Sequence, residues 1–398
     1  MPEQPARGLD PVVAEFNWAF RFLAPVEVLF RRGGAGDLPR IVRERGWSRA
    51  LVLTDANVAA HAGGWLRDRL REESVACEMY VLPAREPTDA TVAPAVAAAA
   101  AWRPDVVIAV GGGSVLDSAK VVSVAAYNGT CDFLPFLKPG TCGVEGALPW
   151  IAVPTTAGTG AEITRGTVVV SEATGVKRGF ARGGNYARIA ILDPALTDGL
   201  PPAITARSGL DAFSQAAEAY LAPRPFPVGD LLSVMALTLV GAHLEGAIAT
   251  GAPEHRDAMM MAAWASAQAF STGAGLTVSH VFSDLVGPRK GLAHGVAGSL
   301  LLPGVVALAE EARPGRAAVL AHALGGEAGP GGAVAAVSRI LTLARAPRVH
   351  EFVGRQEGLA LVAEALDLGD PDGVYNRDEA RRAFETSYDV GLRAADRG

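Results

Sequence analysis

Hydrophobic residues in the first half of the chain fall in short runs that alternate with amphipathic or alanine-rich stretches. The run DVVIAV (105–110) is almost entirely apolar, which is typical of a parallel strand covered on both faces. The stretch DATVAPAVAAAAAW (89–102) has the composition of a helix that tolerates proline near its start. Further strands are expected at 49–54, 77–82, 149–154, 166–171 and 187–192, and a further helix at 61–73. This alternation predicts a doubly wound parallel sheet.

The pattern changes after LPPAIT (200–205), where strand signals give way to helical segments rich in Ala and Leu. The adjacent prolines Pro201 and Pro202 mark a plausible boundary. We therefore expect an α/β domain over residues 17–200 and an all-helical domain over 201–398, after a tail formed by residues 1–16.

Composition and charge limit the classes of partner. The chain has 398 residues, 49% hydrophobic, and a net charge of -6, which gives no basic patch for nucleic acid. Its 3 cysteines contain no CxxC pair, so neither a disulfide framework nor a cysteine metal cluster is indicated. No uninterrupted apolar run reaches the ~18 residues of a spanning helix, and the start lacks the order of a secretory signal. We expect a cytoplasmic protein without a membrane or nucleic-acid partner.

Two loops follow expected strands and could bind phosphate. Gly111, Gly112, Gly113 and Ser114 lie between a strand and a helix, where glycine lets backbone N–H groups approach a pyrophosphate at the helix N-terminus. The alternative is a tight turn that needs glycine only for positive φ, but the strand and helix on either side favour phosphate binding. The second loop, PTTAGTGAE (154–162), offers the hydroxyls of Thr155, Thr156 and Thr159, unless it is only a polar turn.

Asp55 ends the strand expected at 49–54. A carboxylate at this position can accept a hydrogen bond from a ribose hydroxyl and would repel a 2′-phosphate. The alternative role is that of a helix N-cap. The two loops each follow the carboxyl end of an expected strand, which suits a ligand in the crevice that open α/β sheets form there.

The helical half contains polar residues in apolar surroundings. In SGLDAFSQAAEAYLA (208–222), Asp211 and Gln215 lie one helical turn apart, and a buried carboxylate is costly without a positive partner. His280 and His294 lie in an apolar, glycine-rich stretch. Two histidines and a carboxylate are a plausible ligand set for Zn²⁺ or Fe²⁺, the alternative being two buried structural histidines. We interpret Glu218, further along the first helix, as structural.

These segments together resemble the iron-containing (group III) alcohol dehydrogenase family from about residue 25 to 390. The matching stretches are VEVLFRRGGAGDL, REPTDATV, GGGSVLDSAK, VPTTAGTGAEIT, AILDPALTDGLPP and YNRDEARRAFETSY. The resemblance implies a Rossmann-like nucleotide-binding domain and a helical domain, the architecture shared with dehydroquinate synthases. It also implies hydride transfer between a bound nicotinamide and a small alcohol or aldehyde beside a divalent metal, Fe²⁺ or Zn²⁺, in a homodimer formed through the N-terminal strands.

The resemblance also assigns individual residues. It implies a pyrophosphate loop, a threonine loop, a lysine near the nicotinamide (Lys177) and a position linked to a preference for NAD over NADP (Asp55). The cofactor-binding residues that it implies are Gly111, Gly112, Gly113, Ser114, Asp117, Thr155, Thr156, Thr159, Lys177 and Asp55. Three metal ligands of the family match Asp211, His280 and His294. The fourth position, usually His, is Gln215, and Asp284 stands where many members have a further His near the nicotinamide.

These two departures leave several functions open. An amide oxygen is a weaker ligand than an imidazole for either metal, but glycerol dehydrogenases, a related branch, hold zinc with one Asp and two His. Asp284 could be an oxygen ligand, a proton relay, or a partner of Arg289 or Lys290. We expect a metal-assisted dehydrogenase with Asp211, Gln215, His280 and His294 at the metal.

Two alternatives remain. In a metal-independent reductase of an oxo-acid, similar to maleylacetate reductases, Gln215, Asp284 and Lys177 would orient the carbonyl group. In the other, the scaffold would serve a lyase, a cyclase like 3-dehydroquinate synthase, or a binding protein. A cyclase would need a basic cluster for a phosphorylated substrate, for which the candidates are Arg165, Arg178, Arg182, Arg289 and Lys290.

Overall fold

The computed structural model describes residues 19–20, 22–60, 64–137, 146–173, 177–178, 185–222, 226–271, 275–369 and 376–395. The expected tail at 1–16 and the first three residues of the helix expected at 61–73 lie outside these ranges. The chain divides into two compact units. An α/β unit comprises Ala24–Thr156 and Gly160–Gly199, and a helical unit comprises Met1–Leu23, Ala157–Thr159 and Leu200–Gly398.

A parallel sheet forms the centre of the α/β unit, with strand order β1-β8-β5-β4-β2-β3. The bounds of its strands are Glu27–Phe30 (β1), Arg49–Asp55 (β2), Ala76–Leu82 (β3), Val106–Gly111 (β4), Trp150–Pro154 (β5) and Ile189–Leu192 (β8). Every residue of β4, β5 and β8 is buried, as their continuous apolar sequences predict. All five strand pairings are parallel, which confirms the predicted doubly wound sheet.

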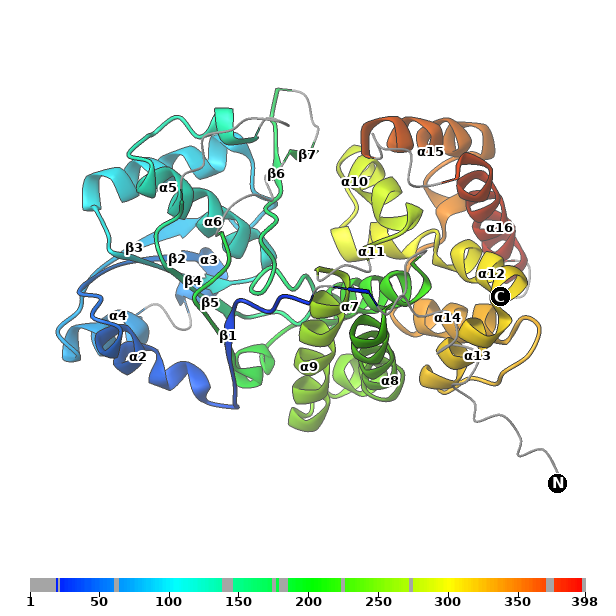
Figure 1. The fold of residues 1–398 in the computed structure, drawn as a ribbon, viewed down its shortest axis with the longest axis horizontal. Coiled ribbons are helices and arrows are strands. Elements are labelled where there is room, and N and C mark those ends of the chain that lie inside the picture. Colours follow the sequence, from blue (N-terminus) through cyan, green and yellow to red (C-terminus); the bar gives the residue numbers. More distant parts are fainter. Residues whose placement is uncertain are drawn as a thin grey trace. The chain divides into compact units, whose positions relative to one another are not determined.

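Helices cover both faces of this sheet. Figure 1 shows α2 and α4 on one face and α5 and α6 on the other. Their bounds are Leu38–Glu44 (α2), Gly64–Glu72 (α4), Asp89–Trp102 (α5) and Gly113–Tyr127 (α6). Short helical segments lie at Gly34–Asp37 (η1), Ala56–Val58 (α3), Leu134–Leu137 (η3) and Pro194–Thr197 (η4). Helix α5 covers the residues predicted for it, because Thr88 caps it by accepting a hydrogen bond from the amide of Thr91.

The prediction of a main-sheet strand at 166–171 was wrong. Only Val169–Val170 (β6) is extended, and it pairs antiparallel with Lys177–Arg178 (β7) in a separate two-stranded sheet. The backbone amides of this segment have other partners: Val168 donates to the carboxylate of Asp117 and Val170 to the carbonyl of Pro87. The β-rich composition was real, but the segment does not join the main sheet.

In the second unit the described residues form helices joined by loops (Figure 1). Its helices are Pro202–Leu221 (α7), Pro227–Ala249 (α8), Pro253–Ala269 (α9), Val278–Lys290 (α10), His294–Ser299 (α11), Leu302–Ala312 (α12), Pro314–Ala323 (α13), Gly332–Leu343 (α14), Val349–Glu351 (η6), Arg355–Gly369 (α15) and Arg377–Ala395 (α16). Four of these helices, α7, α8, α9 and α13, begin with a proline. The missing N–H has no cost there, because the first amides of a helix have no partner within the helix. Helix α7 is buried along almost its whole second half, so it is the central helix of this unit.

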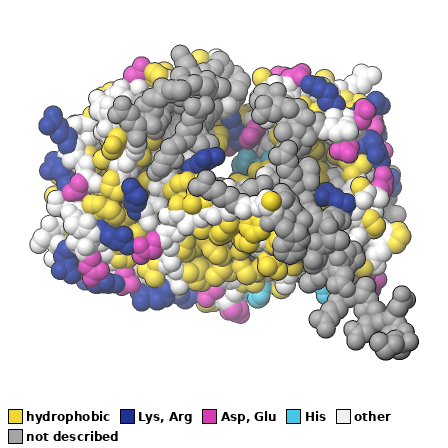
Figure 2. All heavy atoms as spheres, viewed as in Figure 1, with side chains coloured by type: hydrophobic (Ala, Val, Ile, Leu, Met, Phe, Trp, Pro, Cys, Tyr) yellow, Lys and Arg dark blue, Asp and Glu magenta, His cyan; other side chains and the backbone are white. Residues whose placement is uncertain are grey.

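Two helical stretches are long and apolar enough to span a membrane by length and composition alone: Pro227–Ala249, with mean hydropathy 1.7, and His294–Ala312, with 1.4. The second is 72% buried in its apolar window, as in the core of a soluble protein. The first contributes Ala236, Leu237 and Val240 to the buried core. On the face in Figure 2, both basic and acidic side chains of the described residues are visible.

Candidate active site

Three of the predicted metal ligands converge within the helical unit. Asp211 lies in the middle of α7, His280 in the first turn of α10, and His294 at the start of α11. Their ligand atoms all lie within 4.8 Å of one another. Asp211 and His280 are buried, and His294 is partly exposed. The arrangement therefore offers one carboxylate and two imidazoles to a single ion.

The turn between α10 and α11 explains the spacing of the two histidines. Helix α10 begins after Thr277, whose hydroxyl accepts from the amide of Ser279, and ends at Gly291, which has φ 67°. The positive φ suits glycine and reverses the chain so that α11 returns along α10. Ser279 then ties the two helices together by donating to the carbonyl of Gly298 at 2.6 Å.

A glycine sets the approach of α11 to α7. A Cβ atom at Gly295 would lie 2.3 Å from the carbonyl oxygen of Arg207 and 2.7 Å from the Cβ of Asp211. No larger residue fits here without moving one of the two helices. The close contact places His294, the neighbour of Gly295, beside the carboxylate of Asp211.

Glu218 orients His280. Its carboxylate is fully buried, and Oε1 accepts the hydrogen bond of His280 Nδ1. Oε2 accepts from the amide of Thr277 at 2.7 Å, from its hydroxyl at 2.6 Å and from the amide of His280 at 3.2 Å. A carboxylate at Nδ1 fixes the tautomer that leaves Nε2 with its lone pair. Glu218 thus belongs to the site, a role that sequence reasoning missed.

The other ring nitrogen of His280 fits a metal ion. Nε2 is buried, has no hydrogen-bond partner among the described residues, and faces Asp211 Oδ1 at 3.9 Å. Burial alone lowers the pKa of this imidazole, but the charges and hydrogen bonds of Glu218 and Asp211 outweigh it and raise the pKa to about 10. The same negative potential stabilises a cation at this position. The buried, unpartnered nitrogen beside a carboxylate is what a ligand of Zn²⁺ or Fe²⁺ requires.

Gln215 lies at the site with its amide nitrogen toward Asp211. Nε2 donates to Asp211 Oδ1 at 3.1 Å and to the carbonyl of Thr159 at 3.3 Å. Oε1 accepts from the hydroxyl of Ser266 at 3.4 Å. Gln215, at the position of the fourth family ligand, is 3% exposed, and both its amide nitrogen and its amide oxygen have hydrogen-bond partners.

Asp284 lies one turn after His280 with its side chain 56% exposed, and its Oδ1 is 4.0 Å from His294 Nδ1. Arg289 pairs with Glu364 at 2.8 Å, and Lys290 with Glu357 at 2.7 Å, both on α15. These two cations are thus paired with glutamates, so they no longer support the basic cluster that a cyclase would need. Arg182 and the side chain of Arg178, the other members proposed for that cluster, lie outside the described residues, and only Arg165 remains.

The glycine loop of the α/β unit occupies the end of β4 and the start of α6. Gly111 ends β4, and Gly112 caps α6 with backbone only. A Cβ at Gly111 would lie 2.5 Å from Val115 Cγ2, so the helix can begin this close to the strand only after a glycine. Gly113 and Ser114 form the first turn of α6, where backbone N–H groups of a helix attract phosphate.

The threonine loop divides between the two units. Thr155 donates its amide to the carbonyl of Gly111 at 3.0 Å, and Thr156 lies 3.4 Å from where a Cβ on Gly112 would be. Both threonines thus lie beside the glycine loop. Thr159 belongs instead to the segment Ala157–Thr159 of the helical unit, where its carbonyl accepts from Gln215.

The remaining predicted cofactor residues have contacts within the α/β unit. The Asp55 carboxylate caps α3 by accepting from the amides of Asn57 at 2.8 Å and Val58 at 3.1 Å, both at Oδ1. Asp117 accepts from Lys120 at 3.1 Å and from the amide of Val168 at 3.1 Å, which anchors the segment before β6. Lys177, on β7, lies with Nζ 3.7 Å from Glu86 Oε1.

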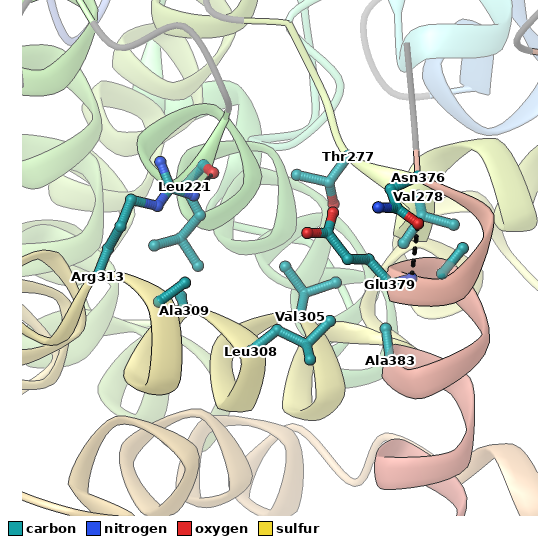
Figure 3. Close-up of a pocket in the computed structure, with 12 residues that line it drawn as sticks. Leu221, Thr277, Val278, Val305, Leu308, Ala309, Arg313, Asn376, Glu379 and Ala383 are labelled. Atoms are coloured by element: carbon teal, nitrogen blue, oxygen red, sulfur yellow. Dashed lines mark hydrogen bonds between the residues drawn. The ribbon is translucent and has the colours of Figure 1, made fainter. Parts of the chain in front are cut away.

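A cavity of about 360 Å³ lies in the helical unit, and none of the three ligand residues lines it (Figure 3). It is mostly apolar, and Figure 3 shows the hydroxyl of Thr277 and the side chains of Asn376 and Glu379 at its polar side. Its lining residues are Leu221, Thr277, Val278, Val305, Leu308, Ala309, Ala312, Arg313, Asn376, Glu379, Ala380 and Ala383. Thr277 connects it with the site, because the same hydroxyl donates to Glu218.

Comparison with known proteins defines the class to which this fold and site belong. The family model described as iron-containing alcohol dehydrogenase matches residues 25–194, and that of the C-terminal part of the Fe-containing alcohol dehydrogenase family matches residues 205–365. The chain therefore belongs to the iron-containing alcohol dehydrogenase family, as its sequence motifs predicted.

Individual relatives agree. The probable alcohol dehydrogenase EutG of Salmonella typhimurium is 35% identical over 72% of each chain. The NAD-dependent methanol dehydrogenase of Bacillus methanolicus is 32% identical over 76% of this chain and 79% of that protein. Among solved structures, 1,3-propanediol oxidoreductase has a TM-score of 0.84 and 27% identity, covering 92% of this chain and 99% of that chain. These relatives confirm the predicted fold and the predicted enzyme class, an alcohol dehydrogenase or aldehyde reductase, and do not favour the lyase, cyclase or metal-independent alternatives.

Proposed function

We propose that the chain catalyses NAD-dependent interconversion of a small alcohol and its aldehyde or ketone, with a divalent metal held by Asp211, His280 and His294. The observation that carries the proposal is the buried, unpartnered Nε2 of His280, which faces the carboxylate of Asp211. When bound, the metal supplies a Lewis acid that polarises the oxygen atom of the substrate. One carboxylate and two imidazoles suit both Fe²⁺ and Zn²⁺.

The side chains around the ligands have distinct tasks in this proposal. Glu218 holds the Nδ1 proton of His280, so that Nε2 keeps its lone pair toward the ion. Asp284, exposed and 4.0 Å from His294, takes or supplies the proton of the substrate hydroxyl at its carboxylate. This division gives the carboxylates two roles: the buried ones orient and bind, and the exposed one exchanges protons with solvent.

We place the dinucleotide on the α/β unit. The N-terminus of α6 with Gly111, Gly112, Gly113 and Ser114 supports a pyrophosphate there, and Thr155 and Thr156 lie directly beside it. Asp55 ends β2 at the same edge of the sheet as β4 does, where a carboxylate binds a ribose hydroxyl and disfavours NADP. We assign Lys177, Asp117 and Thr159 to the binding of the same cofactor.

The assembly is inferred to be a homodimer in the cytoplasm. Strand β1 is an edge strand of the parallel sheet, and Val28 on it is 37% exposed. An edge strand with an exposed apolar residue presents unpaired backbone groups to a second copy. Size-exclusion chromatography with light scattering tests this part of the proposal separately from activity.

Metal analysis and an NADH-oxidation screen test the function together. The purified chain should contain about one divalent ion per protomer, oxidise NADH with aldehydes, and lose this activity to a chelator, because the polarising ion is removed. Readdition of Zn²⁺ or Fe²⁺ should restore it. An enzyme that turns over fully without metal and resists chelator would refute the metal-assisted proposal, and NADH binding without turnover on any aldehyde or oxo-acid would refute the dehydrogenase.

A further inference from the structure

Gln215 occupies a buried position with a polar partner at each atom of its amide. Nε2 has two acceptors, Asp211 Oδ1 at 3.1 Å and the carbonyl of Thr159 at 3.3 Å. Oε1 has the hydroxyl of Ser266 at 3.4 Å. All three contacts are in the helical unit, and Gln215 is 3% exposed, so water does not compete with them.

The partners determine which way the amide points. Asp211 and Thr159 present only oxygen acceptors to it, so the atom between them has to be the NH₂ group. With the amide turned over, Oε1 would lie against two acceptor oxygens, and each would lose the hydrogen bond that Nε2 donates. Ser266 does not decide the orientation: its hydroxyl can donate to Oε1, or donate to the carbonyl of Ala263 at 2.9 Å and accept from the amide. The two acceptors therefore decide the orientation, with the nitrogen toward the metal ligands.

We propose that Gln215 is a positioning residue and not a metal ligand: it clamps the carboxylate of Asp211 to the carbonyl of Thr159 through the two protons of one amide nitrogen. This inference rests on the proposed metal site. An amide N–H cannot coordinate a cation, and to present Oε1 the side chain would give up both donated hydrogen bonds. The protein would then supply three ligands, Asp211, His280 and His294.

The clamp also connects the metal ligand Asp211 with the segment Ala157–Thr159, which comes from the α/β half of the sequence. Thr159 is the last residue of the segment Ala157–Thr159, which is packed on α7 so closely that a Cβ at Gly158 would lie 2.7 Å from the carbonyl oxygen of Ser208. Since both partners of Gln215 Nε2 are held by packing, the amide has little freedom to rotate. Asp211 thereby keeps one rotamer, and its carboxylate is pre-oriented before an ion binds.

Cobalt binding distinguishes a clamp from a ligand. The full-length chain is stripped of metal and titrated with Co²⁺, with affinity measured by competition against a chromophoric chelator and the ligand field by the visible spectrum. Gln215→Leu removes the amide. We expect it to weaken Co²⁺ binding by about 10- to 100-fold, as for loss of a partner that orients a ligand, while the cobalt spectrum stays that of the wild type.

Two further variants calibrate these readouts. Gln215→His introduces a ligand at the same position, so its cobalt spectrum should change and its affinity should rise. Ser266→Ala removes only the partner of Oε1, so both affinity and spectrum should remain those of the wild type. Circular dichroism of the metal-free variants checks folding, and Gln215→Ala replaces Gln215→Leu if the latter does not fold, since Ala suits a helix interior.

A changed cobalt spectrum in Gln215→Leu or Gln215→Ala would identify the amide as a ligand and overturn the proposal. Unchanged affinity in these variants would overturn it as well, because a clamp must matter for the carboxylate it holds. If the wild type takes up no Co²⁺, the proposed metal site itself fails. Uptake by the wild type with an unaffected Gln215→Leu variant refutes the clamp alone, so the two failures are distinguishable.

Discussion

The carboxylate of Glu218 accepts a hydrogen bond from His280 Nδ1. Glu218 is fully buried and lies 62 residues earlier in the chain, on a different helix. The same carboxylate accepts hydrogen bonds from the backbone amides of Thr277 and His280 at the start of α10. One side chain thus caps a helix and sets the tautomer of a ring on that helix. Negative charge at a helix N-terminus is favourable in itself, so the two tasks support each other.

Replacing Glu218 by Gln should weaken metal binding. The amide can still accept from His280 Nδ1, but its NH₂ group would face the backbone amides of Thr277 and His280, which can only donate. We expect about 10- to 100-fold weaker Zn²⁺ binding in a competition titration, the usual cost of losing a ligand's hydrogen-bond partner. Glu364→Gln is the control, because that carboxylate is exposed on α15, where it pairs with Arg289. Equal affinity of Glu218→Gln and wild type would remove Glu218 from the site.

A methyl group at residue 295 should separate α11 from α7. The added Cβ would meet the carbonyl oxygen of Arg207 at 2.3 Å, and backbone cannot yield as a flexible side chain does. Gly295→Ala should lower the free energy of unfolding by about 1–3 kcal/mol and weaken metal binding, since His294 moves with its neighbour. Gly287→Ala is the matched control, because its Cβ would meet its nearest atoms at 3.5 Å. Thermal unfolding and metal titration measure both effects, and an unaffected Gly295→Ala would contradict the packing argument.

Asp55→Asn separates the two roles of that residue. Asparagine caps helices as well as aspartate does, so α3 should persist, while the charge that would repel a 2′-phosphate is lost. The ratio of kcat/KM for NADPH to that for NADH should rise about fivefold or more, since a close like-charge contact near a surface costs at least ~1 kcal/mol. Steady-state kinetics with both cofactors give the ratio, and an unchanged ratio would leave Asp55 with the capping role alone.

Glu162 should make the stability of the protein depend on pH. Burial raises its pKa to about 7 from 4.5, although its own backbone hydrogen bond and the charge of Lys120 oppose the shift. The folded state thus retains a proton that the unfolded state releases, so stability falls as pH rises from about 4.5 to 7, by roughly 3 kcal/mol. Glu162→Gln should flatten this dependence in denaturant unfolding between pH 5 and 8. Glu78→Gln, on the exposed side of β3, should behave as the wild type, and identical slopes in all three proteins would contradict the prediction.

Much of the fold could be predicted from local patterns. The strands β4 and β5 are continuous apolar runs, and α5 begins where Thr88 supplies a cap, so short-range sequence determines both. The stretch 166–171 was misassigned because β-rich composition does not reveal which acceptors a segment's amides will find. Here they find Asp117 and Pro87, which lie far away in the sequence.

The site was predictable only in part. Asp211, His280 and His294 are unusual residues in apolar surroundings, and the structure brings them together. Glu218 is a glutamate on the same helix with no local sign of its partner, which α10 supplies. For Gln215 the sequence gives the residue but not the direction of its amide, because that depends on Thr159 and Ser266, which come from two other segments.

The three residues Ala157–Thr159 limit the modularity of the molecule. They come from the middle of the α/β sequence but pack within the helical unit, where Thr159 provides one of the two acceptors of Gln215. A fragment beginning at Leu200 would keep every candidate metal ligand and still lose that acceptor. Chimaeras that exchange halves between relatives at residue 200 would combine Gln215 of one parent with the segment Ala157–Thr159 of the other. An exchange that preserves the clamp has to transfer the helical half together with this tripeptide.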